Sequence, residues 1–364
     1  MSTPITDPKV CKILQSTLAE TFDQLSYQSQ KPITGIYDAL ESAENTAGIV
    51  KLKADMLGGN IPNGSKTTGR QVIVSGYDAS CAVGTDSDPY FEFDPCDWDA
   101  DSPVAKPVYN SYTITQQASS IPRIFSIAEV KALCEGKQSV ITENLRQMKN
   151  ELLRDLNVKA GTTMMGLMST YTDGTDSVTN PKTLNLISSS TLNFLEFMKL
   201  KVEYGKKGYG QKLIAVGGDQ LSYVSMLQNQ LGLTSGGINL NGTPLPSMYN
   251  DFDLDGIFND GDSHMLTWIP KTFQLLEWYN NEQAEAKFRG PVVELDGMTM
   301  YAEEQAVIDI DGLKVDLFMK YDKCGGYKMA INKWFDIGEL PTGTTCTDKY
   351  PALGYIIACG SASC

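Results

Sequence analysis

A long polar and acidic stretch separates two β-strand patterns in the first third of the chain. Gln71–Val74 and Val108–Thr115 have the β-branched and aromatic content of strands, and the acidic run DSDPYFEFDPCDWDADSP lies between them. This stretch has too few aliphatic residues to form a core, and it is far longer than an ordinary strand connection. The pattern therefore predicts a long protruding hairpin.

The rest of the composition is that of a folded chain. Hydrophobic residues make up 41% of the 364 residues and charged residues 20%, which excludes a disordered polymer. The formal net charge is −14 and the basic residues form no cluster, so a nucleic-acid clamp is not expected. No run approaches the roughly 18 apolar residues that span a bilayer, and the N-terminus lacks signal-peptide features, so no membrane partner is predicted.

The chain has a single histidine, His264, which excludes most hydrolase active sites and all two-His metal sites. One imidazole excludes two-His metal sites and leaves one candidate base for a Ser–His or Cys–His pair. No G-x-S-x-G sequence accompanies it, so we expect a structural or exposed histidine. Gly59 and Gly64 have the spacing of a phosphate-binding loop, but Ser65-Lys66 follows them where the motif needs Lys-Ser or Lys-Thr. The sequence predicts no catalytic residues, no cofactor and a non-enzymatic binding or structural protein.

The eight cysteines do not form a metal or redox motif. None belongs to a C-x-x-C pair, which excludes zinc-ribbon and thioredoxin interpretations. We expect reduced thiols in a protein made in the cytosol, with late pairing of Cys346, Cys359 and Cys364 as an alternative.

The sharpest local motif is DFDLDGIFNDGD, residues 251–262. Acids at positions one, three, five and twelve and a glycine at six match an EF-hand loop, with Asp251, Asp253, Asp255 and Asp262 as candidate calcium ligands. The last acid is the shorter Asp, and the flanks do not predict a helix pair. A surface turn between two strands is therefore preferred, and no metal site is predicted. For the same reason we interpret Asp309–Gly312 as a hairpin turn and not as a metal site.

The strongest helical pattern begins near Ser139. Apolar residues recur at spacings of three and four, which predicts one buried face: Ile141, Leu145, Met148, Leu152 and Leu156. Charged residues fall on the remaining positions, and we expect them to point away: Glu143, Arg146, Lys149, Glu151 and Arg154.

Capping signals and periodicity predict further helices. These are an N-terminal helix with Val10, Leu14, Leu18 and Phe22 inward, a short helix after the capping box Ser126–Glu129, a helix over 190–204, and a helix capped by Asp219. Strand patterns occur at Lys212–Val216, at Met265–Trp278 with an interruption at Pro270, and at Leu313–Tyr321. Gly325-Gly326 then predicts a hairpin into Tyr327–Ile331.

This order of elements resembles the major capsid proteins of tailed bacteriophages, which have the Hong Kong 97-type shell fold. PVYNSYTITQQASSIPRIFSIAEVKAL looks like the returning strand of that family's extended loop and the entry to its peripheral domain. VITENLRQMKNELLRDLNVKAGTTMMG looks like its spine helix, followed by a small-residue segment. KLIAVGGDQLSYVSMLQNQL resembles the axial domain, and HMLTWIPKTFQLLEW and GLKVDLFMKYDKCGGYKMAINKWFDIGELP look like the strands that return to the peripheral domain.

The resemblance implies an α+β fold and a division of the chain. The implied parts are an N-terminal arm (1–66), an extended β-hairpin loop (67–115), a peripheral domain with the spine helix (116–160), an axial α/β domain (161–264), return strands completing the peripheral domain (265–340) and a C-terminal extension (341–364).

The resemblance also implies a function. Such a protein self-assembles into hexamers and pentamers that form an icosahedral shell around double-stranded phage DNA, with portal, scaffolding or decoration proteins as partners. It is made in the bacterial host cytoplasm and located in the virion. Two alternatives stay open: an encapsulin-like nanocompartment shell, and a calcium-stabilised, non-enzymatic binding or surface protein that uses Asp251–Asp262.

Overall fold

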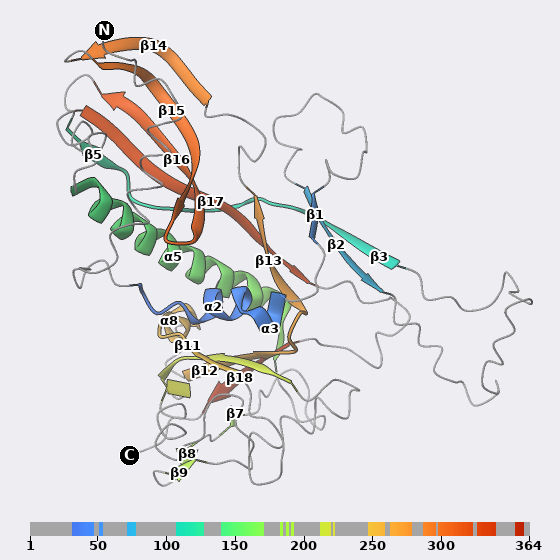
Figure 1. Ribbon diagram of the computed structural model, residues 1–364. Coiled ribbons are helices and arrows are strands. Elements are labelled where there is room, and N and C mark those ends of the chain that lie inside the picture. Colours follow the sequence, from blue (N-terminus) through green and yellow to red (C-terminus); the bar gives the residue numbers. More distant parts are fainter. Residues whose placement is uncertain are drawn as a thin grey trace, which may run out of the picture. The chain divides into compact units, whose positions relative to one another are not determined.

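A computed structural model describes sixteen stretches of the chain (Figure 1), namely 31–46, 51–53, 71–77, 107–126, 140–170, 183–184, 187–188, 191–192, 212–219, 221–222, 247–258, 263–278, 287–295, 298–322, 326–339 and 354–359. The chain divides into two compact units that mix helices and sheets, so the fold is α+β. Unit 1 comprises Met1–Tyr37, Ile114–Ala160 and Glu277–Asp336. Unit 2 comprises Asp38–Thr113, Gly161–Leu276 and Ile337–Cys364.

A seven-stranded sheet contains the long strands near the C-terminal end of the chain. Its order is β13-β17-β16-β15-β14, with β4 and β5 also paired to β17. The bounds are β4 (Gln116–Ser119), β5 (Arg123–Phe125), β13 (Phe273–Trp278), β14 (Lys287–Leu295), β15 (Met298–Ile310), β16 (Leu313–Asp322) and β17 (Gly326–Glu339). The predicted hairpin of β16 and β17 is confirmed, with antiparallel register from Asp316↔Asn332 to Asp322↔Gly326.

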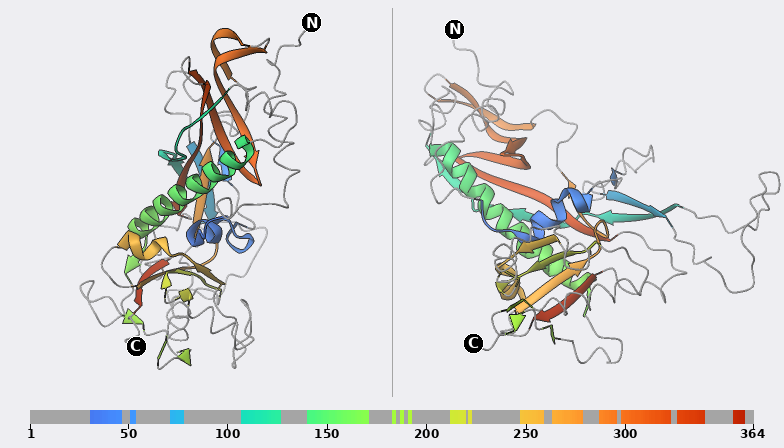
Figure 2. Two further views of the ribbon diagram at one scale, coloured as in Figure 1. Left: turned by 90° about the vertical axis from the view of Figure 1, so that its left-hand side faces the viewer. Right: turned by 60° about the horizontal axis from the view of Figure 1, so that its bottom comes forward.

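Helix α5 (Val140–Leu167) is 28 residues long. Its unit 1 part runs beside β16 and β17 in Figures 1 and 2. The predicted apolar face is confirmed where it is described and continues beyond Leu156, with Leu145, Met148, Leu152, Leu156, Ala160 and Met164 all buried. The small-residue segment AGTTMMG belongs to the helix and does not leave it, because its apolar residues Ala160 and Met164 keep the four-residue spacing of the buried face.

Unit 2 contains a six-stranded sheet of order β11-β10-β12-β18-β6, with β7 also paired to β18. The bounds are β6 (Ser169–Thr170), β7 (Thr183–Leu184), β10 (Ile214–Gly217), β11 (Ser247–Asn250), β12 (Ser263–Trp268) and β18 (Gly354–Cys359). The predicted strands at 212–216 and 265–278 are confirmed. Strand β18 comes from the segment that we expected to be an extension. It lies inside the sheet, because its six residues pair antiparallel with β12 and Ile357 is fully buried.

A three-stranded sheet forms the base of the predicted hairpin. Strands β1 (Lys51–Lys53), β2 (Gln71–Tyr77) and β3 (Pro107–Thr113) follow in that order. Strands β2 and β3 pair antiparallel from Gln71↔Thr113 to Tyr77↔Pro107, which confirms that the two strand patterns are partners. Residues 78–106, between them, lie outside the described residues.

The remaining elements are short. They are α2 (Gly35–Glu41), α3 (Ala43–Thr46), α8 (Asp253–Phe258), β8 (Ile187–Ser188) and β9 (Thr191–Leu192). The helix predicted over 190–204 is wrong at Thr191–Leu192, where the β-branched Thr191 pairs with Ser188. The predicted helices at 7–22 and after Ser126, together with Cys346 and Cys364, lie outside the described residues. No helix in the described ranges is long and apolar enough to cross a membrane.

Candidate functional site

One flank of α5 carries a row of polar side chains at spacings of three and four residues. We call this set, Asn144, Gln147, Glu151, Asp155 and Lys159, the α5 ladder. Residues at these spacings lie one above the other on a helix surface. All five contact the chain segment Gln117–Arg123, which runs from β4 into β5.

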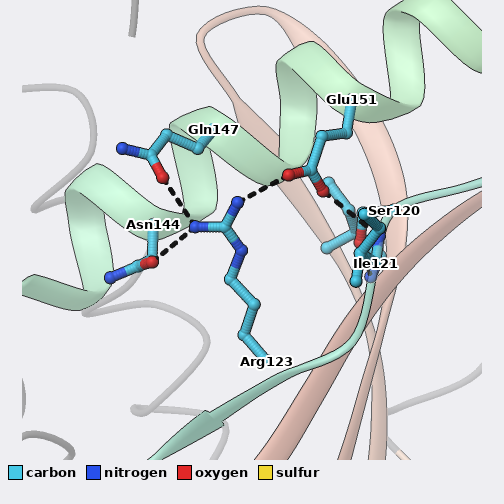
Figure 3. A network of polar contacts seen from close by, with 7 residues as sticks. Ser120, Ile121, Arg123, Asn144, Gln147 and Glu151 are labelled. Carbon is cyan, nitrogen blue, oxygen red and sulfur yellow. Dashed lines mark hydrogen bonds and ion pairs between the residues drawn. The ribbon is translucent and has the colours of Figure 1, made fainter. Parts of the chain in front are cut away.

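Arg123 on β5 joins the first three members of the ladder (Figure 3). One guanidinium nitrogen donates to Asn144 Oδ1 and Gln147 Oε1, both at 2.6 Å. The other lies 2.6 Å from Glu151 Oε1, in an ion pair whose side chains are 23% and 31% exposed. Ion-paired hydrogen bonds of this kind are among the stronger ones in proteins, so Arg123 fixes β5 to the helix.

Three ladder residues, Glu151, Asp155 and Lys159, bond to the backbone of the same segment. Glu151 Oε2 accepts from the Ile121 N–H at 3.2 Å, and Asp155 Oδ2 accepts from the Ser119 N–H at 3.0 Å. Lys159 Nζ donates to the Gln117 carbonyl at 2.7 Å and to Asp155 Oδ2 at 2.8 Å. The Ser120 N–H, between those of Ser119 and Ile121, donates to the Ile331 carbonyl of β17. Backbone groups of successive residues in a strand point to opposite sides, so the ladder bonds to the groups that face away from β17.

The other flank of α5 holds the turn between β15 and β16. Lys149 Nζ donates to the Asp311 carbonyl at 3.1 Å, and Arg146 Nε lies 3.5 Å from Asp311 Oδ2. Asp311 and Gly312 both have positive φ, 49° and 82°, and Asp309 Oδ1 accepts from the Gly312 N–H at 2.7 Å. The predicted hairpin turn at Asp309–Gly312 is therefore confirmed.

The expectation that the charged residues of α5 point away is wrong for three of them. Glu151 binds the β4–β5 segment, and the side chains of Arg146 and Lys149 are only 6% and 12% exposed beside Asp311. Burial lowers the pKa of Lys149, and the nearby Asp311 carboxylate opposes this shift. Long basic side chains can cover apolar surface with their stems while the head group finds a partner, which periodicity does not reveal. Arg154 is exposed, as expected.

In unit 2, the buried side chain of Asn45 connects α3 to the β12–β13 turn. Its Nδ2 donates to the carbonyls of Leu40 and Phe273, at 3.0 and 2.8 Å, and its Oδ1 accepts from the Lys271 N–H at 2.8 Å. Lys271 follows Pro270 and has φ of 77°, so the hydrogen bond from its N–H supports a backbone conformation that lysine seldom adopts.

The candidate calcium ligands occupy a short helix and its start. Asp253–Phe258 is α-helical, which differs from the surface turn that the sequence analysis prefers over these residues. The buried Asp251 accepts from the Asp253 N–H at 3.1 Å through Oδ1, because an aspartate before a helix satisfies its first N–H groups. Asp253 is exposed and Asp262 lies outside the described residues. No group of three or more His, Cys, Asp or Glu side chains suited to a metal occurs among the described residues.

Asp255 connects three segments of unit 2. Its carboxylate accepts from the backbone N–H groups of His264, at 2.9 Å, and Asp219, at 3.2 Å. The sequence predicts Asp219 as the cap of a helix, but Asp219 is itself helical, and the carboxylate that accepts from its N–H comes from Asp255 of α8. His264 is buried, and its ring stacks on Phe258 with centroids 3.8 Å apart. This is the structural histidine that the sequence predicts.

Comparisons with known proteins give only distant likenesses. No family model and no curated protein matches the chain. Among solved structures, the virus-like particle from Pyrococcus furiosus is similar at 8% identity and a TM-score of 0.35, over 70% of this chain and 80% of that one. The cyanophage A-1(L) capsid has 10% identity and a TM-score of 0.39, over 70% and 79%. The capsid of Ralstonia phage GP4 has 9% identity and a TM-score of 0.39, over 99% and 97%.

Sequence reasoning missed the α5 ladder and the Asn45 contacts. The ladder has a signal in its spacing, because residues 144, 147, 151, 155 and 159 share one helix flank. Its partner segment could not be read from the sequence, because only the pairing of β4 and β5 with β17 places it beside α5. Asn45 has no local signal, since three of its partners come from residues 268–273.

Proposed function

We propose that this chain is the subunit of a capsid-like protein shell, and specifically a major capsid protein of the Hong Kong 97 type. The observation that supports the proposal is the order of the elements along the chain. The β2–β3 ribbon leads through Ile114 into β4 and β5, α5 follows, and a second sheet is inserted. Strands β14–β17 then follow, and the last of them, β17, pairs with β4 and β5.

This arrangement suits lateral assembly. In unit 1, the β4–β5 segment and the later strands β14–β17 belong to one sheet, and we infer that this part packs side by side with other copies. The acidic residues of 78–106 would then lie across another copy. A closed shell needs such contacts repeated by symmetry.

The proposal assigns roles to the parts of the chain. Residues 1–66 form the arm, 67–115 the extended loop, 116–160 with 265–340 the peripheral domain, and 161–264 the axial domain. We move residues 265–268 and 354–359 to the axial domain, because β12 pairs with both β10 and β18 in the sheet of unit 2.

The proposed partners follow from this role. Copies of the chain form hexamers and pentamers of an icosahedral shell around double-stranded DNA, which is held without sequence specificity. Portal, scaffolding or decoration proteins complete the particle. The protein is non-enzymatic, is made in the host cytoplasm and resides in the virion.

The test is negative-stain microscopy with light scattering on the protein expressed alone and with its neighbouring genes. We expect shells, tubes or rings of megadalton mass. The matched control replaces residues 77–107 by Asn-Gly, which joins the paired residues Gly76 and Val108 through a two-residue turn. This variant should keep its circular dichroism and lose the assemblies. A monodisperse particle of about the 39.8 kDa chain mass in both preparations would contradict the proposal.

The contents of these particles, or their absence, distinguish the proposed function from its alternatives. Nucleic acid inside them supports the phage capsid, whereas a packaged protein supports a nanocompartment shell. A monomer whose stability falls on addition of a calcium chelator would favour the calcium-stabilised surface protein and the candidate ligands Asp251, Asp253, Asp255 and Asp262.

A further inference from the structure

In the described part of the chain, the β4–β5 segment lies at an edge of the seven-stranded sheet. Both strands pair with β17 on one side, and no strand in the described part of the chain pairs with their other side. An open edge carries a row of N–H and C=O groups that can add a strand from another molecule. Two large apolar side chains on this segment, Ile121 and Ile124, are 68% and 59% exposed, which makes strand addition more favourable.

The α5 ladder occupies the bonding groups of this edge. The outward groups at alternate residues are the Gln117 carbonyl and the N–H groups of Ser119 and Ile121. An ammonium group meets the carbonyl, and a carboxylate meets each N–H. Three successive positions are therefore matched in polarity by Lys159, Asp155 and Glu151, which are spaced four residues apart on the helix.

The two carboxylates are held in place by cations. Glu151 pairs with Arg123 at 2.6 Å, and Asp155 pairs with Lys159 at 2.8 Å. Another edge of the same sheet has a different protection. Strand β14 has a register shift between Arg289 and Val292, where Gly290-Pro291 stands, and proline offers no N–H.

We propose that the α5 ladder is an edge seal, which prevents a β-strand of a second copy from adding to the β4–β5 segment. The seal is independent of the proposed shell function, because strand addition at this edge would produce open-ended aggregates. The helix thus has two roles in unit 1: its apolar face covers the sheet, and its polar flank closes the sheet's edge.

The test uses the full-length chain with the double substitution Glu151→Ala and Asp155→Ala. The matched control is Arg154→Ala, an exposed position on the same helix. Hydrogen exchange followed by mass spectrometry reads the protection of the Ser119 and Ile121 amides, and thioflavin T fluorescence reads strand-type aggregation. We expect about a ten-fold faster exchange at these amides and new aggregation in the double variant, because each amide loses its acceptor. The control should match the wild type.

A third substitution separates edge pairing from general destabilisation. Ile121→Pro, added to the double variant, removes the N–H with which an added strand would bond. In the native fold this N–H bonds to Glu151, and the double variant has already lost that acceptor. Suppression of the aggregation by Ile121→Pro supports the seal. Aggregation that persists with Ile121→Pro, or amide exchange unchanged in the double variant, overturns it. Neither readout depends on shell formation.

Discussion

The Tyr112 hydroxyl exchanges two hydrogen bonds with the backbone of Glu339. It donates to the Glu339 carbonyl at 2.5 Å and accepts from the Glu339 N–H at 3.0 Å. Tyr112 is the second-to-last residue of β3, and Glu339 is the last residue of β17, so one side chain connects the β2–β3 ribbon to the end of the long strand. Gly338 permits this approach, because a Cβ there would lie 2.7 Å from Leu276 Cδ1 and 3.2 Å from the Tyr112 ring.

Tyr112→Phe should therefore loosen the base of the ribbon. We expect a loss of about 1 to 2 kcal/mol in the free energy of unfolding, because a partly buried N–H and C=O lose their partner while the ring remains. Urea denaturation measures the loss, and faster exchange of the Glu339 amide locates it. An unchanged amide would show that the ring alone positions the strand.

Glu339 itself predicts a pH dependence. Burial raises its pKa above the ordinary value of 4.5. Between that value and the higher folded-state pKa the folded protein holds more protons, so its stability falls as the pH rises through this window. Glu339→Gln removes the buried charge and should be more stable than the wild type at neutral pH. The difference should shrink as the pH falls towards 4.5, which thermal denaturation at several pH values would reveal.

Asn45→Ala should be costly in unit 2. At this fully buried position, the substitution removes the donor of the Leu40 and Phe273 carbonyls. It also removes the acceptor of the Lys271 N–H. We expect a loss of about 3 kcal/mol, since each unsatisfied buried group costs 1 kcal/mol or more. Ser42→Ala is the comparison, because it removes a half-buried hydroxyl that bonds to the Ala39 carbonyl and the Asn45 N–H but keeps the Asn45 side chain, and it should cost about 1 kcal/mol.

Gly218 and Asp255 should be energetically coupled. A Cβ at Gly218 would collide with the Asp255 carboxylate, so Gly218→Ala should displace that side chain from the Asp219 and His264 N–H groups. We expect a loss of about 2 kcal/mol for Gly218→Ala alone. Combined with Asp255→Ala, it should cost little more than Asp255→Ala does, and a double-mutant cycle measures this. Additive losses would contradict the proposed contact.

Lys333 and Glu277 should behave as a buried ion pair. Lys333 Nζ lies 2.5 Å from Glu277 Oε1, and the two side chains are 2% and 23% exposed. Glu277→Ala leaves the ammonium group without its counter-charge and should cost about 3 kcal/mol. Adding Lys333→Met should recover most of that loss, because a long apolar chain replaces the charge. Denaturation of the three variants tests this, and no recovery in the double variant would assign the loss to packing.

Hydrophobic periodicity correctly predicted the buried face of the long helix and the pairing of two long strands. The face of α5 defined by Leu145, Met148, Leu152 and Leu156 is buried as its spacing predicts, and β16 and β17 pair as the Gly325-Gly326 turn predicts. Periodicity failed for Arg146 and Lys149, because it distinguishes apolar from charged residues and does not identify the Asp311 carboxylate that accommodates the cations.

Local sequence determined the strands, the long helix and the hairpin turn of this protein, because hydrophobic spacing and positive-φ preferences act over a few residues. The calcium-like motif shows the limit of such reasoning. Asp251 and Asp255 accept from backbone N–H groups, and those bonded to Asp255 belong to His264 and Asp219, 9 and 36 residues away. Only the tertiary structure decided that β18 enters the unit 2 sheet and that the α5 ladder faces Gln117–Ile121. Those contacts join residues far apart in the chain, and their energy exists only after the sheets have formed.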